Sequence, residues 1–103
     1  MSKNANQDIK QLRAIGHKLK PVVTIAGNGL TEGVFAEIER ALGDHELIKI
    51  KLAVGSRETR AAVINEICDR AKAELVQSVG NMAVILRRAA KPDPRLSNLI
   101  RAL

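Results

Sequence analysis

Hydrophobic positions in the first part of the chain change from a helical to a strand period. Ile9, Leu12 and Ile15 recur at helical spacing, which predicts a first helix over residues 7–18. The run Val-Val-Thr-Ile over residues 22–25 is rich in β-branched side chains, which predicts a strand. A short element of each kind therefore precedes the first glycine-rich stretch.

The next segment carries the most regular amphipathic pattern of the chain. Apolar residues fall at every fourth position over 30–42, which predicts a helix with one buried face. Thr31 is a favourable N-cap residue, and we expect Gly43 to end the helix.

The segment 47–52 alternates between aliphatic residues and the two lysines Lys49 and Lys51. Period two places the aliphatic side chains on a core face and the lysines on a face open to water. We therefore expect one face of the sheet to remain largely uncovered, with the helices packed mainly on the other.

Ser56 predicts the start of a third helix, and a hairpin follows it. Two apolar segments, 74–79 and 82–88, flank Gly80-Asn81, which is the composition of a tight turn. The order helix–strand–helix–strand–helix–strand–strand favours parallel pairing with right-handed crossovers, plus one antiparallel strand from the hairpin. The predicted fold is α/β, with a mixed four-stranded sheet.

Length and charge limit the possible functions. The 103 residues suit one domain, which we assign to residues 1–90, with 91–103 as a proline-containing linker and tail. The formal net charge of +6 points to a polyanionic partner. We expect no membrane span, a cytoplasmic location and a monomer, and the single cysteine, Cys68, fits a reducing compartment.

The stretch from Ala26 to Gly33 joins the first strand to the second helix and contains three glycines. Backbone N–H groups at such a helix N-terminus can hold a phosphate, although the glycines could also serve only a tight turn. A dinucleotide fingerprint, and with it a nucleotide-dependent enzyme, is disfavoured because the glycine spacing is one residue too long and no acid ends the next strand. The Gly-Lys-Ser/Thr of a P-loop is also absent.

Residues suited to catalysis are sparse. His17 and His45 are the only imidazoles, Cys68 lies on an apolar helix stripe, and no cluster has metal-ligand spacing. We therefore expect neither enzymatic activity nor a cofactor. Phe35 is the only aromatic residue, so any RNA partner must be held through backbone, shape and charge instead of an aromatic stacking surface.

Three sequence blocks carry a resemblance to a known family. Residues 19–23 (Leu-Lys-Pro-Val-Val), 27–34 (Gly-Asn-Gly-Leu-Thr-Glu-Gly-Val) and 45–51 (His-Glu-Leu-Ile-Lys-Ile-Lys) resemble the CRM domain, named for chloroplast RNA splicing and ribosome maturation, and especially its stand-alone bacterial YhbY-like members. The resemblance covers about residues 8–88. It implies a fold similar to the C-terminal domain of initiation factor three, a GxxG-type RNA-binding loop, and association with ribosomal RNA in precursors of the large ribosomal subunit.

The loop departs from the family pattern at Ala26, where a glycine is usual, and we expect Gly27 to adopt the unusual backbone geometry instead. A KH fold is disfavoured because a strand, not a helix, precedes the loop. Basic pairs occur at 18/20, 49/51, 57/60 and 87/88. The predicted RNA-binding residues are Lys18, Lys20, Gly27, Asn28, Gly29, Thr31, Lys49, Lys51, Arg57 and Arg60.

One alternative remains open from the sequence. The chain could be a protein-interaction module of the ribosome that docks through the open sheet face and the apolar tail residues Leu96, Leu99 and Ile100. Salt dependence distinguishes the two, since phosphate contacts weaken steeply with salt and apolar docking does not.

Overall fold

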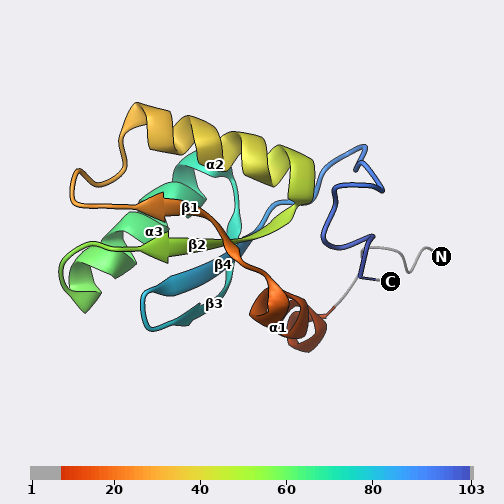
Figure 1. Cartoon of the computed structure of the whole chain (residues 1–103), viewed down its shortest axis with the longest axis horizontal. Coiled ribbons are helices and arrows are strands. Elements are labelled where there is room, and N and C mark those ends of the chain that lie inside the picture. The colour runs from red at the N-terminus through yellow and green to blue at the C-terminus, as the bar shows by residue number, and fades with distance from the viewer. Residues whose placement is uncertain (1–7, 103) are drawn as a thin grey trace.

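A computed structural model describes residues 8–102 of the chain. Within these residues, three helices and four strands follow one another in the predicted order (Figure 1). The bounds are α1 (Ile9–Lys18), β1 (Pro21–Ile25), α2 (Glu32–His45), β2 (Leu47–Leu52), α3 (Arg57–Ala71), β3 (Glu74–Val79) and β4 (Met82–Leu86).

The four strands form one mixed sheet with the spatial order β1-β2-β4-β3. Strand β1 pairs with β2 in parallel, whereas β4 is antiparallel to both β2 and β3. The antiparallel strand is β4, which the hairpin inserts between β2 and β3. The predicted α/β fold with a mixed four-stranded sheet is confirmed.

Helices α2 and α3 cover one face of the sheet and enclose the larger core. Ile48, Ile50 and Leu52 of β2 are fully or almost fully buried there, together with Ile38 of α2 and Ile67 of α3. Burying such side chains contributes about 1.5–3 kcal/mol each, which makes this layer the main source of stability.

Helix α1 covers part of the opposite face, beside the C-terminal segment. Leu12 of α1 packs with Leu47 of β2, Val84 of β4 and the fully buried Leu99 in a second, smaller core. This close packing requires Gly16, because a Cβ there would lie only 2.8 Å from Val84 Cγ1. The expectation of helices mainly on one face therefore holds for α2 and α3, and α1 leaves only part of the other face open.

The predicted starts of α2 and α3 are confirmed, whereas α1 begins at Ile9, two residues later than predicted, with Asp8 as its N-cap. The Oγ1 atom of Thr31 accepts a hydrogen bond from the N–H of Val34 at 3.2 Å, and Ser56 Oγ accepts one from the N–H of Thr59 at 3.2 Å.

The predicted end of α2 at Gly43 is wrong, because the helix continues to His45. Glu46 follows with φ of +65°, a conformation that non-glycine residues rarely adopt. Its buried carboxylate accepts hydrogen bonds from Ser97 Oγ and from the N–H of Ala89, both at 2.5 Å. These long-range bonds, and not a local glycine, determine where the helix ends.

The C-terminal segment lies against the end of α2 through polar contacts as well as Leu99. The Nδ1 atom of His45 lies 2.8 Å from the carbonyl of Leu96, and Asn98 Nδ2 donates to the carbonyl of Leu47 at 2.6 Å. A domain boundary at residue 90 stays a prediction, but residues 96–100 take part in the packing of the sheet.

Replacement of Gly16 by alanine is expected to destabilise the protein. The added methyl group overlaps the stiff, buried side chain of Val84, and overpacking of this kind costs about 1–3 kcal/mol, which exceeds the gain in helix propensity. Gly43→Ala is the matched control, since its Cβ meets nothing within 4 Å and the change should stabilise by about 0.5–1 kcal/mol. Urea unfolding of both variants measures the difference, and a stabilised Gly16→Ala variant would contradict the close contact.

Ser97→Ala is expected to lower the free energy of unfolding by about 1–3 kcal/mol, because it leaves the buried carboxylate of Glu46 without one donor. Ser78→Ala is the control, because Ser78 is exposed and its hydroxyl forms no hydrogen bond with another described residue. Thermal unfolding followed by circular dichroism compares the two, and equal stabilities would show that the contact is energetically unimportant.

Candidate nucleic-acid interface

Three loops meet at the carboxyl ends of β1 and β2. The N–H of Ala53, after β2, donates to the carbonyl of Ile25 at 2.8 Å, and the N–H of Leu52 donates to the carbonyl of Asn81 at 2.7 Å. The glycine loop (residues 26–31), the β2–α3 loop (53–56) and the hairpin tip (80–81) therefore share one end of the molecule, at the left of Figure 1. We call this the loop end.

The glycine loop is a hydrogen-bonded turn. The N–H of Gly29 donates to the carbonyl of Ala26 at 2.9 Å, and Gly29 itself has φ of +74°. Ala26 and Gly27 do not have positive φ, so the expectation that Gly27 adopts the left-handed geometry is wrong. The positive φ falls on Gly29, the fourth residue of the turn, where glycine is common. Ala26, the first residue of the turn, is therefore tolerated without strain.

Two glycines near this turn have no evident role inside the protein. Gly27 and Gly33 have ordinary φ values, and a Cβ at either position would meet nothing within 4 Å. Gly33 even lies in the first turn of α2, where glycine weakens a helix relative to alanine. Gly27 and Asn28 are both exposed at the tip of the loop.

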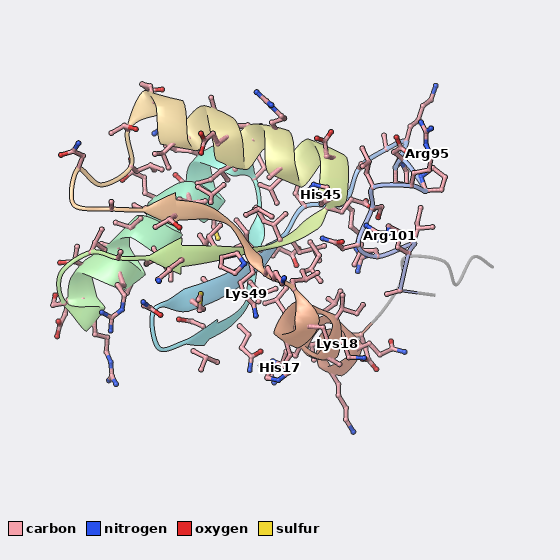
Figure 2. All side chains as sticks on the ribbon, viewed as in Figure 1. His17, Lys18, His45, Lys49, Arg95 and Arg101 are labelled. Atoms are coloured by element: carbon pink, nitrogen blue, oxygen red, sulfur yellow. The ribbon has the colours of Figure 1, made fainter. Side chains whose placement is uncertain are left out.

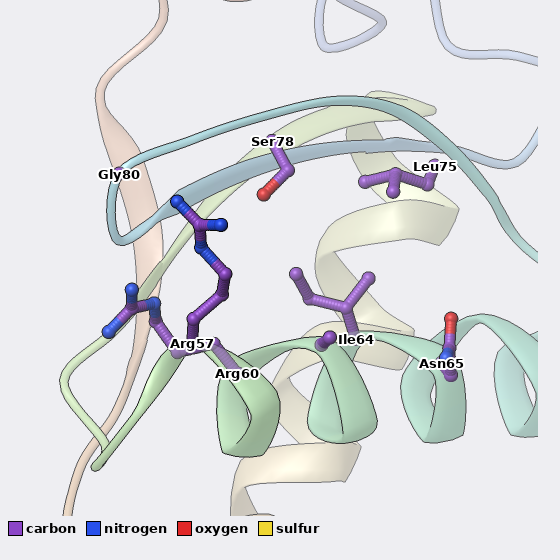
Figure 3. Close-up of a pocket in the computed structure, with 8 residues that line it drawn as sticks. Arg57, Arg60, Ile64, Asn65, Leu75, Ser78 and Gly80 are labelled. Atoms are coloured by element: carbon purple, nitrogen blue, oxygen red, sulfur yellow. The ribbon is translucent and has the colours of Figure 1, made fainter.

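Arg57 and Arg60 lie in the first turns of α3, also at the loop end. Both line a cavity of about 370 Å³ between α3 and the β3–β4 hairpin (Figure 3). Arg60 Nη1 donates to the carbonyl of Gly55 at 3.3 Å, which leaves most of its donors for an external group.

Lys49 and Lys51 lie half-buried on the sheet face that α1 leaves open. Lys51 is next to Thr24 of β1 and Met82 of β4 in the ladder, close to the loop end. The Nζ atom of Lys49 donates to the carbonyl of His17 at 3.3 Å, which connects this strand to the C-terminal end of α1 (Figure 2). The alternation of β2 therefore places both lysines where the sequence predicts them.

Lys18 and Lys20 lie at the other end of this basic surface, around the C-terminal end of α1. They border a shallow depression together with Asn98 and Arg101 of the C-terminal segment. Arg101 is a basic neighbour that the sequence analysis missed, because only the long-range packing of Leu99 brings the segment back to α1. The ten predicted residues thus fall into two groups, one at the loop end and one at α1, with Lys49 and Lys51 between them.

Some basic residues are held by internal partners instead. Arg87 Nη1 lies 2.8 Å from Glu39 Oε1 and 3.0 Å from the carbonyl of Ala71, so Arg87 links α2 to α3. Arg70 lies over the ring of Phe35, with 4.0 Å from Cζ to the ring centroid, and pairs with Glu32. The single aromatic ring is therefore covered and does not offer a free stacking surface.

Features typical of enzymes are few in the described residues. Between residues 8 and 102, no group of three histidine, cysteine or acidic side chains could hold a metal ion. Burial raises the pKa of the Cys68 thiol, which reduces the thiolate fraction and hence the reactivity of this cysteine. No helix in the same part of the chain is long and apolar enough to cross a membrane.

Comparison with protein families gives a match to the CRS1 / YhbY (CRM) domain over residues 5–87, most of the chain. The chain belongs to the CRM domain family. This finding confirms the resemblance that the sequence blocks indicate. The glycine loop, both lysines of β2 and the two arginines of α3 all lie within the matched CRM domain.

Several CRM-domain relatives have descriptive names. A protein of Pseudomonas aeruginosa named "Probable RNA-binding protein" is 55% identical over 92 residues, which cover 89% of this chain and 88% of that protein. A protein of Haemophilus influenzae named "RNA-binding protein" is 53% identical over 76 residues, which cover 74% of this chain and 77% of that protein. The solution structure of a hypothetical protein from Staphylococcus aureus has a TM-score of 0.73 at 26% identity and covers 84% of this chain and 90% of its own.

Proposed function

We propose that this CRM-domain protein is a non-enzymatic RNA-binding protein that holds RNA at the loop end and along the lysines of β2. The observation that carries the proposal is the pair of glycines, Gly27 and Gly33, that no contact inside the described structure requires. The finer proposal is that the partner is ribosomal RNA in precursors of the large ribosomal subunit, bound in the cytoplasm by a monomer without a cofactor.

Close approach of an external backbone explains these glycines. A missing Cβ lets a phosphate approach the N–H groups of the turn and of the first turn of α2, where the helix dipole favours negative charge. Thr31 caps α2 through its oxygen and keeps its hydroxyl hydrogen for donation. Gly27, Asn28, Gly29 and Thr31 thus form the proposed phosphate contact.

Uncommitted positive charge supports a polyanionic ligand. Arg57, Lys51 and Lys49 are not in salt bridges among the described residues, whereas Arg87 and Arg70 are. Arg57 at the loop end and Lys51 on the open sheet face are therefore available to an anion, whereas Arg87 and Arg70 are held between α2 and α3. This separation is expected of a surface that tracks a phosphate backbone.

The names of the relatives support RNA as the polyanion. Ribosomal RNA is the expectation that comes with the CRM family, whose name includes ribosome maturation. The alternative of protein docking through Leu96, Leu99 and Ile100 loses support, because Leu99 is fully buried in the second core and Leu96 is the one of these three that is exposed.

Gly27→Asp is expected to weaken RNA binding by roughly tenfold or more, because it places a carboxylate where the phosphate approaches, and charge-assisted contacts are worth about 1.5–3 kcal/mol. Position 27 suits this test better than Gly29, whose φ of +74° would add backbone strain to any substitution. Filter binding to a ribosomal RNA fragment at fixed salt measures the effect.

Gly27→Asn is the matched control, since it adds a side chain of nearly the same size without the charge. It should lose affinity because of the added Cβ, but less than Gly27→Asp. Equal affinities of Gly27→Asp and wild type, with both variants folded, would remove the glycine loop from the interface.

Lys51→Gln is expected to make the plot of the logarithm of the RNA association constant against the logarithm of salt concentration less steep. The magnitude of the slope should fall by about 0.7–0.9, the value for one phosphate contact. The control is Lys72→Gln, which removes the same charge from the opposite end of α3 and should leave the slope unchanged. Fluorescence anisotropy titrations between 50 and 300 mM KCl, with a labelled RNA hairpin, give both slopes. A Lys72→Gln variant that loses as much slope as Lys51→Gln would mean that only net charge matters.

A further inference from the structure

The cavity between α3 and the hairpin differs from the rest of the proposed interface because its floor is apolar. Ile64 of α3 lies at the floor and is 4% exposed, and Leu75 of β3 forms a wall although 46% of its surface is exposed. Figure 3 shows Ile64 between the two arginines at one end and Leu75 and Asn65 at the other. A large exposed aliphatic side chain in the same cavity as two guanidinium groups makes an amphipathic site, which the basic surface alone does not explain.

The polar groups of this cavity are available to a ligand. The side chains of Arg57, Asn65 and Ser78 form no hydrogen bond with another residue between 8 and 102. The residues that line the cavity include no carboxylate, so its charge comes from Arg57 and Arg60 alone. An occupant should therefore carry negative charge at the Gly80 end and a flat or apolar part with polar edges at the Leu75 end.

The size of the cavity limits the occupant. About 370 Å³ is near the lower bound for small-molecule sites and is too little for a helix or a folded partner. A single nucleotide fits this volume and combines a phosphate with a base that has an apolar face and hydrogen-bonding edges. Because the one aromatic ring of the chain is covered, the aliphatic side chains of Ile64 and Leu75 offer the apolar surface against which the face of a base can pack.

We infer that the groove lined by Arg57, Arg60, Ile64 and Leu75 binds one unpaired nucleotide of the RNA. Its phosphate lies against the arginines, and its base enters between α3 and β3, where Asn65 and Ser78 contact the edge. This inference rests on the proposed RNA-binding function and extends it from the phosphate backbone to an extruded base. The protein then favours bulges or unpaired positions next to a helix over continuous duplex.

The test compares two RNA hairpins that have equal numbers of phosphates. Both carry a one-nucleotide bulge, which is an adenosine in the first and an abasic residue in the second. Wild type should bind the adenosine bulge about fivefold to tenfold more tightly, because base contacts of this kind contribute a comparable factor in single-strand binding. Ala61 lies on α3 and lines the groove, so Ala61→Leu narrows the groove and should reduce this preference to less than twofold.

Ala62→Leu is the matched control, since Ala62 is exposed on the same helix but does not line the groove, and it should keep the preference. Arg57→Gln should weaken binding of both hairpins.

Equal affinity of wild type for the two hairpins, an unchanged preference in Ala61→Leu, or an equal loss on both hairpins in Ala61→Leu would overturn the base site and leave RNA binding intact. Failure of wild type to bind either hairpin would instead overturn the proposed function.

Discussion

The parallel pairing of β1 with β2 is the constraint on which the rest of the interface depends. Because both strands run in the same direction, their carboxyl ends lie at the same edge of the sheet, and the helices that follow them start from that edge. The bond from the N–H of Ala53 to the carbonyl of Ile25 extends this pairing into the loops themselves. The glycine loop and the arginines of α3 are therefore held together by the backbone ladder, not by direct contact between their side chains.

The second determinant is the unequal cover of the two sheet faces. Helices α2 and α3 bury one side of β2 completely, whereas α1 and the C-terminal segment cover only Leu47 and its neighbours on the other. The contact of Gly16 with Val84 fixes how closely α1 approaches, and Lys49 and Lys51 remain on the uncovered part. Packing thus leaves a basic strip between the loop end and α1, and the same strip links the two groups of predicted residues.

Local sequence signals predicted the elements, both helix caps and the hairpin, because each depends on residues only a few positions apart. Long-range contacts account for the errors. The end of α2 depends on Glu46 meeting Ser97, 51 residues later, and no local pattern near Gly43 contains that information. The same holds for Arg101, and for Arg87, which follows β4 and has its partner Glu39 on α2. The roles of the ten predicted residues in RNA binding stay predictions, although their positions on the fold are now described.

The central claim is that RNA contacts the loop end and the open lysine face together. Titration of the isotope-labelled protein with an unlabelled ribosomal RNA hairpin, followed through its amide resonances by NMR, tests this claim directly. The account predicts perturbations at residues 26–31, 53–60 and 80–81 and at the two lysines of β2, with little change on the outer surface of α2 around Arg40. Perturbations confined to α2, or none at RNA concentrations that saturate a related CRM protein, would contradict it.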